Sequence, residues 1–229
     1  MRARVFLMLS AVLVLATLAI DLLLIPSLAV TESEKLLIQF SPIFYWHIPV
    51  AWIALFAFLC VFIASIAYLV KRKPFWDIVA TTSAELGVVF TTLFLLTGSI
   101  WAKYAWGTWW EWDARLTSSL VLWIIYVAYF LVRAYISSPE QRARFAAVFG
   151  ILGFLDVPIV ILTLFVSRQM HPGDAAFHLD KWQQMTALTV GVLAFTALYF
   201  ALLFFVIHLR EDASELARLK QSVEEKENE

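Results

Sequence analysis

Residues 44–70 of this chain read FYWHIPVAWIALFAFLCVFIASIAYLV, a run of 27 residues without Asp, Glu, Lys or Arg. A helix needs roughly 17 to 25 mainly apolar residues to cross a hydrocarbon core of about 30 Å, and this run is long enough. Five other segments have the same character. The sequence therefore predicts six transmembrane helices, near residues 5–30, 44–70, 82–102, 116–136, 145–167 and 185–208.

The overall composition supports the same class and limits the ligand chemistry. The chain is 62% hydrophobic with a mean hydropathy of +0.81, so we expect a single-domain, all-α integral membrane protein with short loops. A net charge of -1 gives no indication of nucleic-acid binding. The single cysteine, Cys60, excludes an internal disulfide, a C-x-x-C redox pair and a C-x-x-C-H site for covalent haem.

The basic residues predict the orientation. Of the 17 Lys and Arg residues, 12 fall on the side of the predicted membrane that carries both termini. The positive-inside rule places that side in the cytoplasm, with the charged tail 210–229 as a solvated helical or disordered end. Three segments then face outward, at 31–43, 103–115 and 168–184, and we expect function to reside there.

The first apolar segment also resembles a secretory signal, because Arg2 and Arg4 precede it and Ser-Leu-Ala at 27–29 has the small-x-small pattern of a cleavage site. Its apolar stretch continues to Val30, well past the core of about 7–15 residues that a signal has. The sequence therefore favours a retained helix. Cleavage would leave the orientation of the other five helices unchanged.

Five of the ten tryptophans lie within the stretch WAKYAWGTWWEWDAR, residues 101–115. If this stretch is helical, Trp106, Trp109, Trp110 and Trp112 fall within an arc of roughly 160° that also contains Asp113. Such a stripe suits a broad planar ligand, for example a porphyrin or a quinone. The alternative is an aromatic belt at the lipid headgroups, although belts usually supply one or two aromatics per helix end. We expect an outward-facing, tryptophan-rich amphipathic platform over 103–115.

Two histidines are expected on the same membrane face. His47 stands in YWHIPVAW at the outer start of the second segment, where Pro49 fits the first turn of a helix, and His171 stands in RQMHPGD beyond the fifth. Two imidazoles that reach an aromatic platform from different helices suit axial ligation of a haem iron. The alternative is that each is a hydrogen-bonded interfacial residue. His178, in a loop, and His208, at the cytoplasmic end, are not expected to be ligands.

The tryptophan stretch carries a family resemblance. WGTWWEWDARLTS at 106–118 resembles the signature W-G-x-x-W-x-W-D-x-R-x-T-S of the haem-handling proteins of cytochrome c maturation, and YWHIP and MHP occur in the corresponding outward positions. With 229 residues and six predicted spans, the chain is similar to the haem exporter protein C family, also called cytochrome c maturation protein C. The larger haem lyase proteins share the signature but not this length.

The resemblance implies a haem-binding and haem-transfer protein, not an enzyme, in the bacterial inner membrane with its site on the periplasmic face. The implied partners are a periplasmic haem chaperone (cytochrome c maturation protein E), the ABC-transporter pair (cytochrome c maturation proteins A and B), the small cytochrome c maturation protein D and membrane lipid. The implied cofactor is non-covalent haem b with His47 and His171 as axial ligands. The implied platform comprises Trp101, Trp106, Gly107, Trp109, Trp110, Trp112 and Asp113.

Charged residues add two further expectations. Haem propionates need basic partners, and Arg115 and Arg168 are the first candidates. The alternative is that these side chains contact lipid headgroups. Acids within spans are costly in lipid. The three acids within the predicted spans have no basic residue at matched depth. We therefore expect them to serve helix packing or subunit contacts rather than an ion relay: Asp21, Glu85 and Asp156. A proline at 158 predicts a kink in the fifth helix.

A second function class is a membrane enzyme or transport subunit that acts on another planar or lipid-linked ligand through Glu111 and Asp113. Such an enzyme usually shows a clustered metal or nucleophile motif such as H-E-x-x-H or G-x-S-x-G, and neither is present. A purely structural subunit would not require the platform. The sequence therefore favours haem binding and transfer.

Overall fold

The computed structural model describes residues 2–23, 41–166 and 182–227, and every regular element within these ranges is a helix. Five stretches are long and apolar enough to cross a membrane, and a shorter one, Val5–Asp21, lies in the first helix. The prediction of an all-α, multi-span membrane protein is confirmed. The helices are α1 (Arg2–Leu23), α3 (Ser41–Lys71), α4 (Pro74–Trp106), α5 (Ala114–Tyr135), α6 (Pro139–Phe154), α7 (Asp156–Val166) and α8 (Trp182–Glu227).

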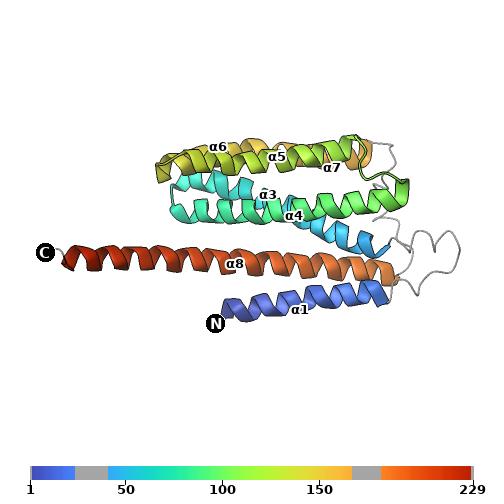
Figure 1. Cartoon of the computed structure of the whole chain (residues 1–229), viewed down its shortest axis with the longest axis horizontal. Helices are drawn as coiled ribbons and strands as arrows, with labels where there is room; N and C mark the ends of the chain where they lie inside the picture. Colours follow the sequence, from blue (N-terminus) through green and yellow to red (C-terminus); the bar gives the residue numbers. More distant parts are fainter. Residues whose placement is uncertain (1, 24–40, 167–181, 228–229) are drawn as a thin grey trace.

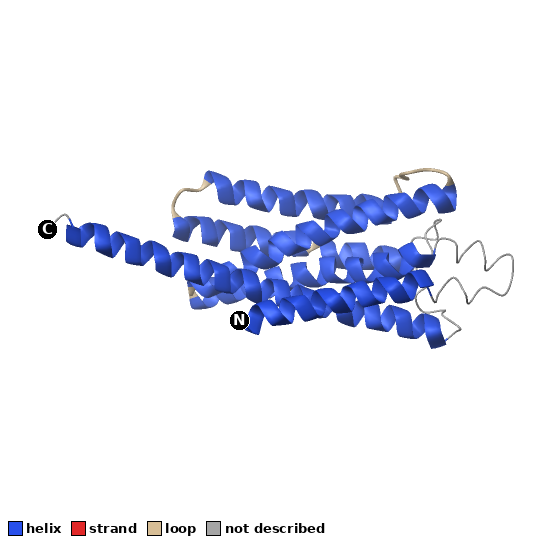
Figure 2. Cartoon of the chain, turned by 60° about the horizontal axis from the view of Figure 1, so that its bottom comes forward, coloured by secondary structure: helices blue, strands red, loops and turns tan. Residues whose placement is uncertain are grey.

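The helices form one bundle around the antiparallel pair α3 and α4 (Figure 1). Helices α5, α6 and α7 cover one side of this pair, and α8 with α1 covers the other. Both chain termini lie toward one end of the bundle, which we call the terminal end; the α4–α5 connection lies at the opposite end, which we call the tryptophan end. The last turns of α8 project beyond the bundle at the terminal end (Figure 2).

The tryptophan stretch does not form the continuous helix that would place its rings on one arc. Helix α4 ends at Trp106 because Gly107 adopts a φ of 79°, and the Gly107 amide donates to the Lys103 carbonyl over 3.1 Å. Helix α5 begins at Ala114 because the Asp113 carboxylate accepts from the Leu116 amide over 2.7 Å. We call the non-helical residues 107–113 the tryptophan loop. The expectation of a shared helical arc was therefore wrong.

Two prolines interrupt or enter helices. The predicted kink in the fifth segment is confirmed, because α6 ends at Phe154 and α7 begins at Asp156. Pro158 has no amide to donate to the carbonyl of Phe154, four residues earlier, which explains the position of the break. The expected first-turn place of Pro49 was wrong, since α3 already begins at Ser41 and Pro49 lies inside it.

Small residues let the helices approach closely, as is usual in membrane bundles. A Cβ on Gly87 would lie 2.4 Å from the ring of Phe58, so only glycine fits there. The Phe58 ring in turn stacks on Tyr126 of α5 with centroids 3.7 Å apart. Gly153 of α6 packs on Ile125 in the same way. These contacts fix α5 and α6 on the central pair.

Among the described side chains, two ion pairs link helices at the terminal end. Arg133 of α5 donates to both carboxylate oxygens of Asp77 of α4, over 2.6 and 3.0 Å. Arg210 of α8 donates to both oxygens of Glu85 of α4, over 2.6 and 2.7 Å. The expectation that Glu85 lacks a basic partner was therefore wrong, because the helical start of the charged tail supplies one.

Candidate functional site at the tryptophan end

His47 lies on α3 and faces a single turn of α4. Its Nδ1 atom is 2.9 Å from the hydroxyl of Thr97, and its ring centroid is 4.8 Å from that of Phe94. A Cβ on Gly98 would lie 3.0 Å from the Cε1 atom of His47, so the imidazole rests directly on the α4 backbone. Residues 94, 97 and 98 share one face of a helix at this spacing. One turn of α4 therefore sets both the position and the rotation of the imidazole.

Arg115 lies within electrostatic range of this histidine. Its side chain belongs to the first turn of α5 and the residue is only 6% exposed. The guanidinium interacts electrostatically with Asp113 and with His47. The structure thus brings together two of the residues that the sequence selected, from different helices, and places a positive charge close to the imidazole.

The tryptophan loop folds back on the last turns of α4. Side chains of α4 donate hydrogen bonds to carbonyl groups of the loop. Ser99 donates to the carbonyl of Trp109 over 2.7 Å, and Lys103 donates to the carbonyl of Gly107 over 2.9 Å. The Lys103 ammonium also lies over the Trp109 ring, 6.0 Å from its centroid. Within the loop, Thr108 donates to the carbonyl of Trp110 over 2.9 Å. The loop is thus tied to α4 within the two turns that follow Thr97.

The tryptophans of the stretch have different surroundings. Trp109 and Trp112 are 57% and 76% exposed, so they offer open aromatic surface. Trp110 is half-buried and meets Trp112 edge to face, with centroids 5.7 Å apart. Trp101 is half-buried on α4, and the side chain of Trp106 lies outside the described part. A planar ligand at this end would meet Trp109 and Trp112 first.

Gly107 and Asp113 set the ends of the two helices that flank the loop. Gly107 allows the left-handed turn that ends α4, and no atom lies within 4 Å of the position its Cβ would take. Asp113 caps α5, which places Arg115 at the helix start. The two residues therefore define where the tryptophan loop begins and ends.

Two expected site residues, His171 and Arg168, lie outside the described residues. Their placement relative to His47 therefore stays a prediction. Among the residues that the structure does describe, no three or more His, Cys, Asp and Glu side chains form a group able to hold a metal ion. A haem iron needs fewer protein ligands than a free metal ion, because the porphyrin supplies four ligands and the protein supplies only the axial ones.

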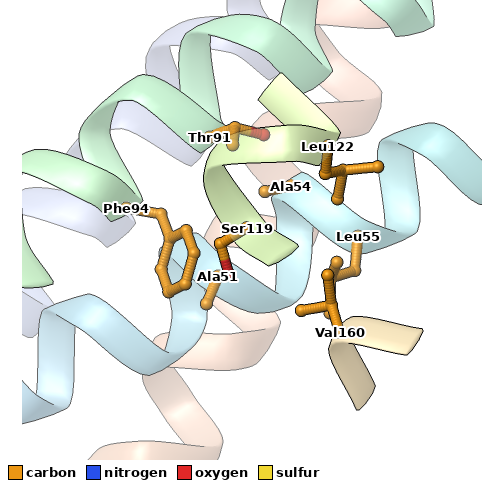
Figure 3. A pocket seen from close by; sticks show the side chains of 8 residues that line it. All are labelled: Ala51, Ala54, Leu55, Thr91, Phe94, Ser119, Leu122 and Val160. Carbon is orange, nitrogen blue, oxygen red and sulfur yellow. The ribbon is translucent and has the colours of Figure 1, made fainter. Parts of the chain in front are cut away.

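A small cavity lies between α3, α4, α5 and α7. Its volume is about 20 Å³, and Phe94, which contacts the His47 ring, forms part of its wall together with Ser119 (Figure 3). Small-molecule pockets usually measure roughly 300–1,000 Å³. This cavity is therefore too small for a porphyrin.

The sequence interpretation missed the residues that support His47 and the loop. Thr97, Gly98 and Ser99 stand together in LTGSI, directly before the tryptophan stretch. Three small residues in a row within an apolar span were the available signal, because such residues mark close helix contacts. Their partners, however, lie on another helix and in the loop.

Known proteins resemble this chain along most of its length. The family model described as Heme exporter protein C matches residues 2–227. The Heme exporter protein C of Bradyrhizobium diazoefficiens is 35% identical over 176 residues, which cover 77% of this chain and 66% of that protein. The Heme exporter protein C of Rhodobacter capsulatus is 29% identical over 187 residues, 81% of this chain and 77% of the relative.

The Heme exporter protein C of Escherichia coli K12 is 33% identical over 132 residues, which cover 58% of this chain and 54% of that protein. The chain thus spans just under two thirds of the Bradyrhizobium relative and about half of the E. coli relative. The family model itself spans His47, the tryptophan loop and Arg115. The chain therefore belongs to the Heme exporter protein C family.

Proposed function

We propose that this protein binds haem at its tryptophan end and passes it to a haem-accepting protein during cytochrome c maturation. One observation carries the proposal: Arg115 lies within electrostatic range of His47, next to a loop that exposes Trp109 and Trp112. Family membership supports it, because the relatives are named as haem exporters. The names also point to a transport component rather than an enzyme.

The residues at this end fit haem. His47 supplies an axial nitrogen, the two exposed indoles supply flat apolar surface, and Arg115 supplies a cation for a propionate. Bound haem would contribute an iron that accepts imidazole nitrogen. With Cys60 as the single cysteine, no pair of thioether bonds is available, so the haem would be held non-covalently as haem b.

The second axial ligand in this proposal is His171, and the second propionate partner is Arg168. Both follow Val166, the end of α7, and α7 ends at the tryptophan end (Figure 1). The exposed ligand surface also suits transfer, because a haem held outside the bundle is open to an acceptor. We assign that role to the periplasmic haem chaperone, with the ABC-transporter pair and the small cytochrome c maturation protein D as further partners.

The orientation in the proposal follows from charge. Basic residues are concentrated toward the terminal end, which places it in the cytoplasm and the tryptophan end in the periplasm of a bacterial inner membrane. Reporter fusions at Glu229 and within 172–180 test this. A cytoplasmic signal at Glu229 with a periplasmic signal at 172–180 agrees with the proposal, and the reverse pattern would place the haem site on the wrong side.

The alternative through Glu111 and Asp113 has less support from the geometry, because the Asp113 carboxylate already caps α5. The visible absorption spectrum of the purified protein separates the classes. Two axial histidines give low-spin haem with a sharp Soret band, whereas an enzyme of another ligand or a structural subunit has none. A purified protein that neither retains nor takes up haem would contradict the proposal.

A further inference from the structure

Two neighbouring segments of the terminal end carry a group of cations that the haem site does not use. They come from the α3–α4 turn and from the first turns of α6 (Figure 1). Ala143 of α6 packs against Tyr68 of α3, and the Arg72 amide donates to the Tyr68 carbonyl over 2.8 Å, so the two segments meet around Tyr68. We call these cations the basic patch: Lys71, Arg72, Lys73, Arg142 and Arg144.

Little opposite charge balances the basic patch. The hydroxyl of Tyr68 lies within electrostatic range of Arg72 and Arg144, which come from the two segments. Two acids, Asp77 and Glu140, lie within range as well, but the guanidinium from α5 already holds Asp77. Among the described side chains, none of the five cations forms an ion pair. The patch therefore carries positive charge that the described chain does not neutralise.

Two of the cations stand where local stability favours another residue. Arg72 has a φ of 53°, a left-handed conformation that glycine adopts at lower cost. Lys73 is the N-cap of α4 but makes no side-chain capping hydrogen bond, which Ser, Thr, Asp or Asn would make. The positive-inside rule favours cations in such a loop but does not require them at these two positions. Departures from local rules are expected at functional sites, so the two cations point to an anionic ligand.

Large apolar side chains border the basic patch. Val70 comes directly before it, Phe75 shortly after it, and Phe145 lies on α6; all three are exposed. The Lys71 ammonium lies over the ring of Trp76, 5.0 Å from its centroid. Inorganic phosphate would use the cations alone. A phospholipid would use both features, because its phosphate meets the cations and its acyl chains meet the apolar side chains.

We propose that the basic patch binds the headgroup of an anionic phospholipid at the membrane surface of the terminal end. Arginine suits this role because its guanidinium can donate two hydrogen bonds to one phosphate. One bound lipid would link the α3–α4 turn to α6. The site lies at the opposite end of the bundle from His47, so the proposal goes beyond the haem role and does not depend on it.

Lipid binding can be measured on the full chain purified in a neutral detergent. Native mass spectrometry counts bound phosphatidylglycerol, which is anionic, and bound phosphatidylcholine, which has the same phosphate but no net charge. We expect phosphatidylglycerol to bind and to raise the melting temperature, and phosphatidylcholine to do so much less. Equal binding of the two lipids would overturn the proposal, as would inorganic phosphate that raises the melting temperature as much as phosphatidylglycerol does.

Arg72→Gly should change stability and lipid binding in opposite directions. Glycine suits a φ of 53°, so the variant should melt about 2–4 °C higher in the absence of lipid. The loss of one cation should weaken phosphatidylglycerol binding about fivefold. Lys73→Ser should act likewise, because serine caps α4. If both variants keep the affinity of the wild-type protein, the proposal is wrong, and an acidic protein surface becomes the better partner for the patch.

A third variant leaves the α3–α4 turn unchanged. Arg144→Gln should also weaken phosphatidylglycerol binding about fivefold. The matched control is Arg218→Gln, which removes one charge from an exposed position on the projecting part of α8 at the same end. It should leave the lipid affinity unchanged. Equal losses in Arg144→Gln and Arg218→Gln would show attraction by overall charge rather than by a site, and would overturn the proposal.

Discussion

The two ends of the bundle place their charged and polar side chains in contrasting surroundings. At the terminal end, charges meet opposite charges across helices, as Arg133 meets Asp77 and Arg210 meets Glu85. At the tryptophan end, the imidazole of His47 lies among the Thr97 hydroxyl, the backbone of Gly98 and the ring of Phe94. The indoles of Trp109 and Trp112 at this end are largely exposed. If the proposed function holds, one end stabilises the bundle and the other meets the ligand.

The largest effect should come from breaking the more buried ion pair at the terminal end. Asp77→Ala leaves the guanidinium of Arg133, which is 13% exposed, without its carboxylate. Because the pair is only part-buried, the loss of unfolding free energy should lie between the roughly 1 kcal/mol of an exposed pair and the about 3–5 kcal/mol of a fully buried one. We expect this loss in thermal unfolding in detergent, with an unaltered haem spectrum in the protein that remains folded.

The matched control replaces both charges, Asp77→Leu with Arg133→Leu, and should recover most of the lost stability because no unpaired charge is left. A single variant that unfolds like the wild-type protein would show that the terminal end does not stabilise the bundle.

The next effect distinguishes a ligand platform from an aromatic belt. Trp109→Ala should lower haem affinity, because an aromatic contact is worth about 1 kcal/mol beyond the area it buries, which corresponds to roughly fivefold. Trp110→Ala should act in the same direction. Trp182→Ala is the control, since Trp182 is 71% exposed at the start of α8 and lies outside the motif. Equal losses for Trp109 and Trp182, measured by haem titration, would favour the belt.

Variants of Asp113 should have an effect of comparable size, but on haem transfer more than on haem binding. Asparagine is as good a helix cap as aspartate, so Asp113→Asn should keep α5 and the haem spectrum nearly intact while reducing transfer to the chaperone. Asp113→Ala removes the cap as well and should cost about 1 kcal/mol of stability. Haem loss in the asparagine variant as complete as that in a double variant of His47 and His171 would instead make the carboxylate part of the binding site.

The smallest effect should come from the second ion pair of the terminal end. The side chains of Arg210 and Glu85 are 33% and 43% exposed, so water and salt screen their attraction. Glu85→Gln should therefore change the free energy of unfolding by less than about 1 kcal/mol, with a difference that shrinks as salt is added. A loss as large as that of Asp77→Ala would show that this pair is as important as the buried one.

Local chemistry explains which features were predictable. The apolar segments, the break before Pro158 and the resemblance of the tryptophan stretch depend on neighbouring residues, so the sequence alone predicted them. The end of α4 was also within reach, because Gly107 and Asp113 are typical residues for ending one helix and starting the next. The assumption of a continuous helix through 106–113 overlooked both signals.

Contacts between distant helices were not predictable in this way. Arg210 and Glu85 are 125 residues apart, and their pairing depends on how α8 lies along α4. The contact of Thr97 with His47 depends on the rotation of α3 against α4. A span that is hydrophobic on all sides does not specify that rotation, because no single face is marked for burial. Packing of small residues sets that rotation, and it becomes visible only in the assembled bundle.

The visible spectrum of two histidine variants tests the central claim most directly, that haem binds at the tryptophan end through His47. His208 is the matched control, because it lies at the terminal end and is exposed. We predict that His47→Ala, like His171→Ala, leaves weakly bound or high-spin haem, and that His208→Ala keeps the low-spin spectrum of the wild-type protein. An unaltered low-spin spectrum in His47→Ala, or an equal change in His208→Ala, would contradict the assignment.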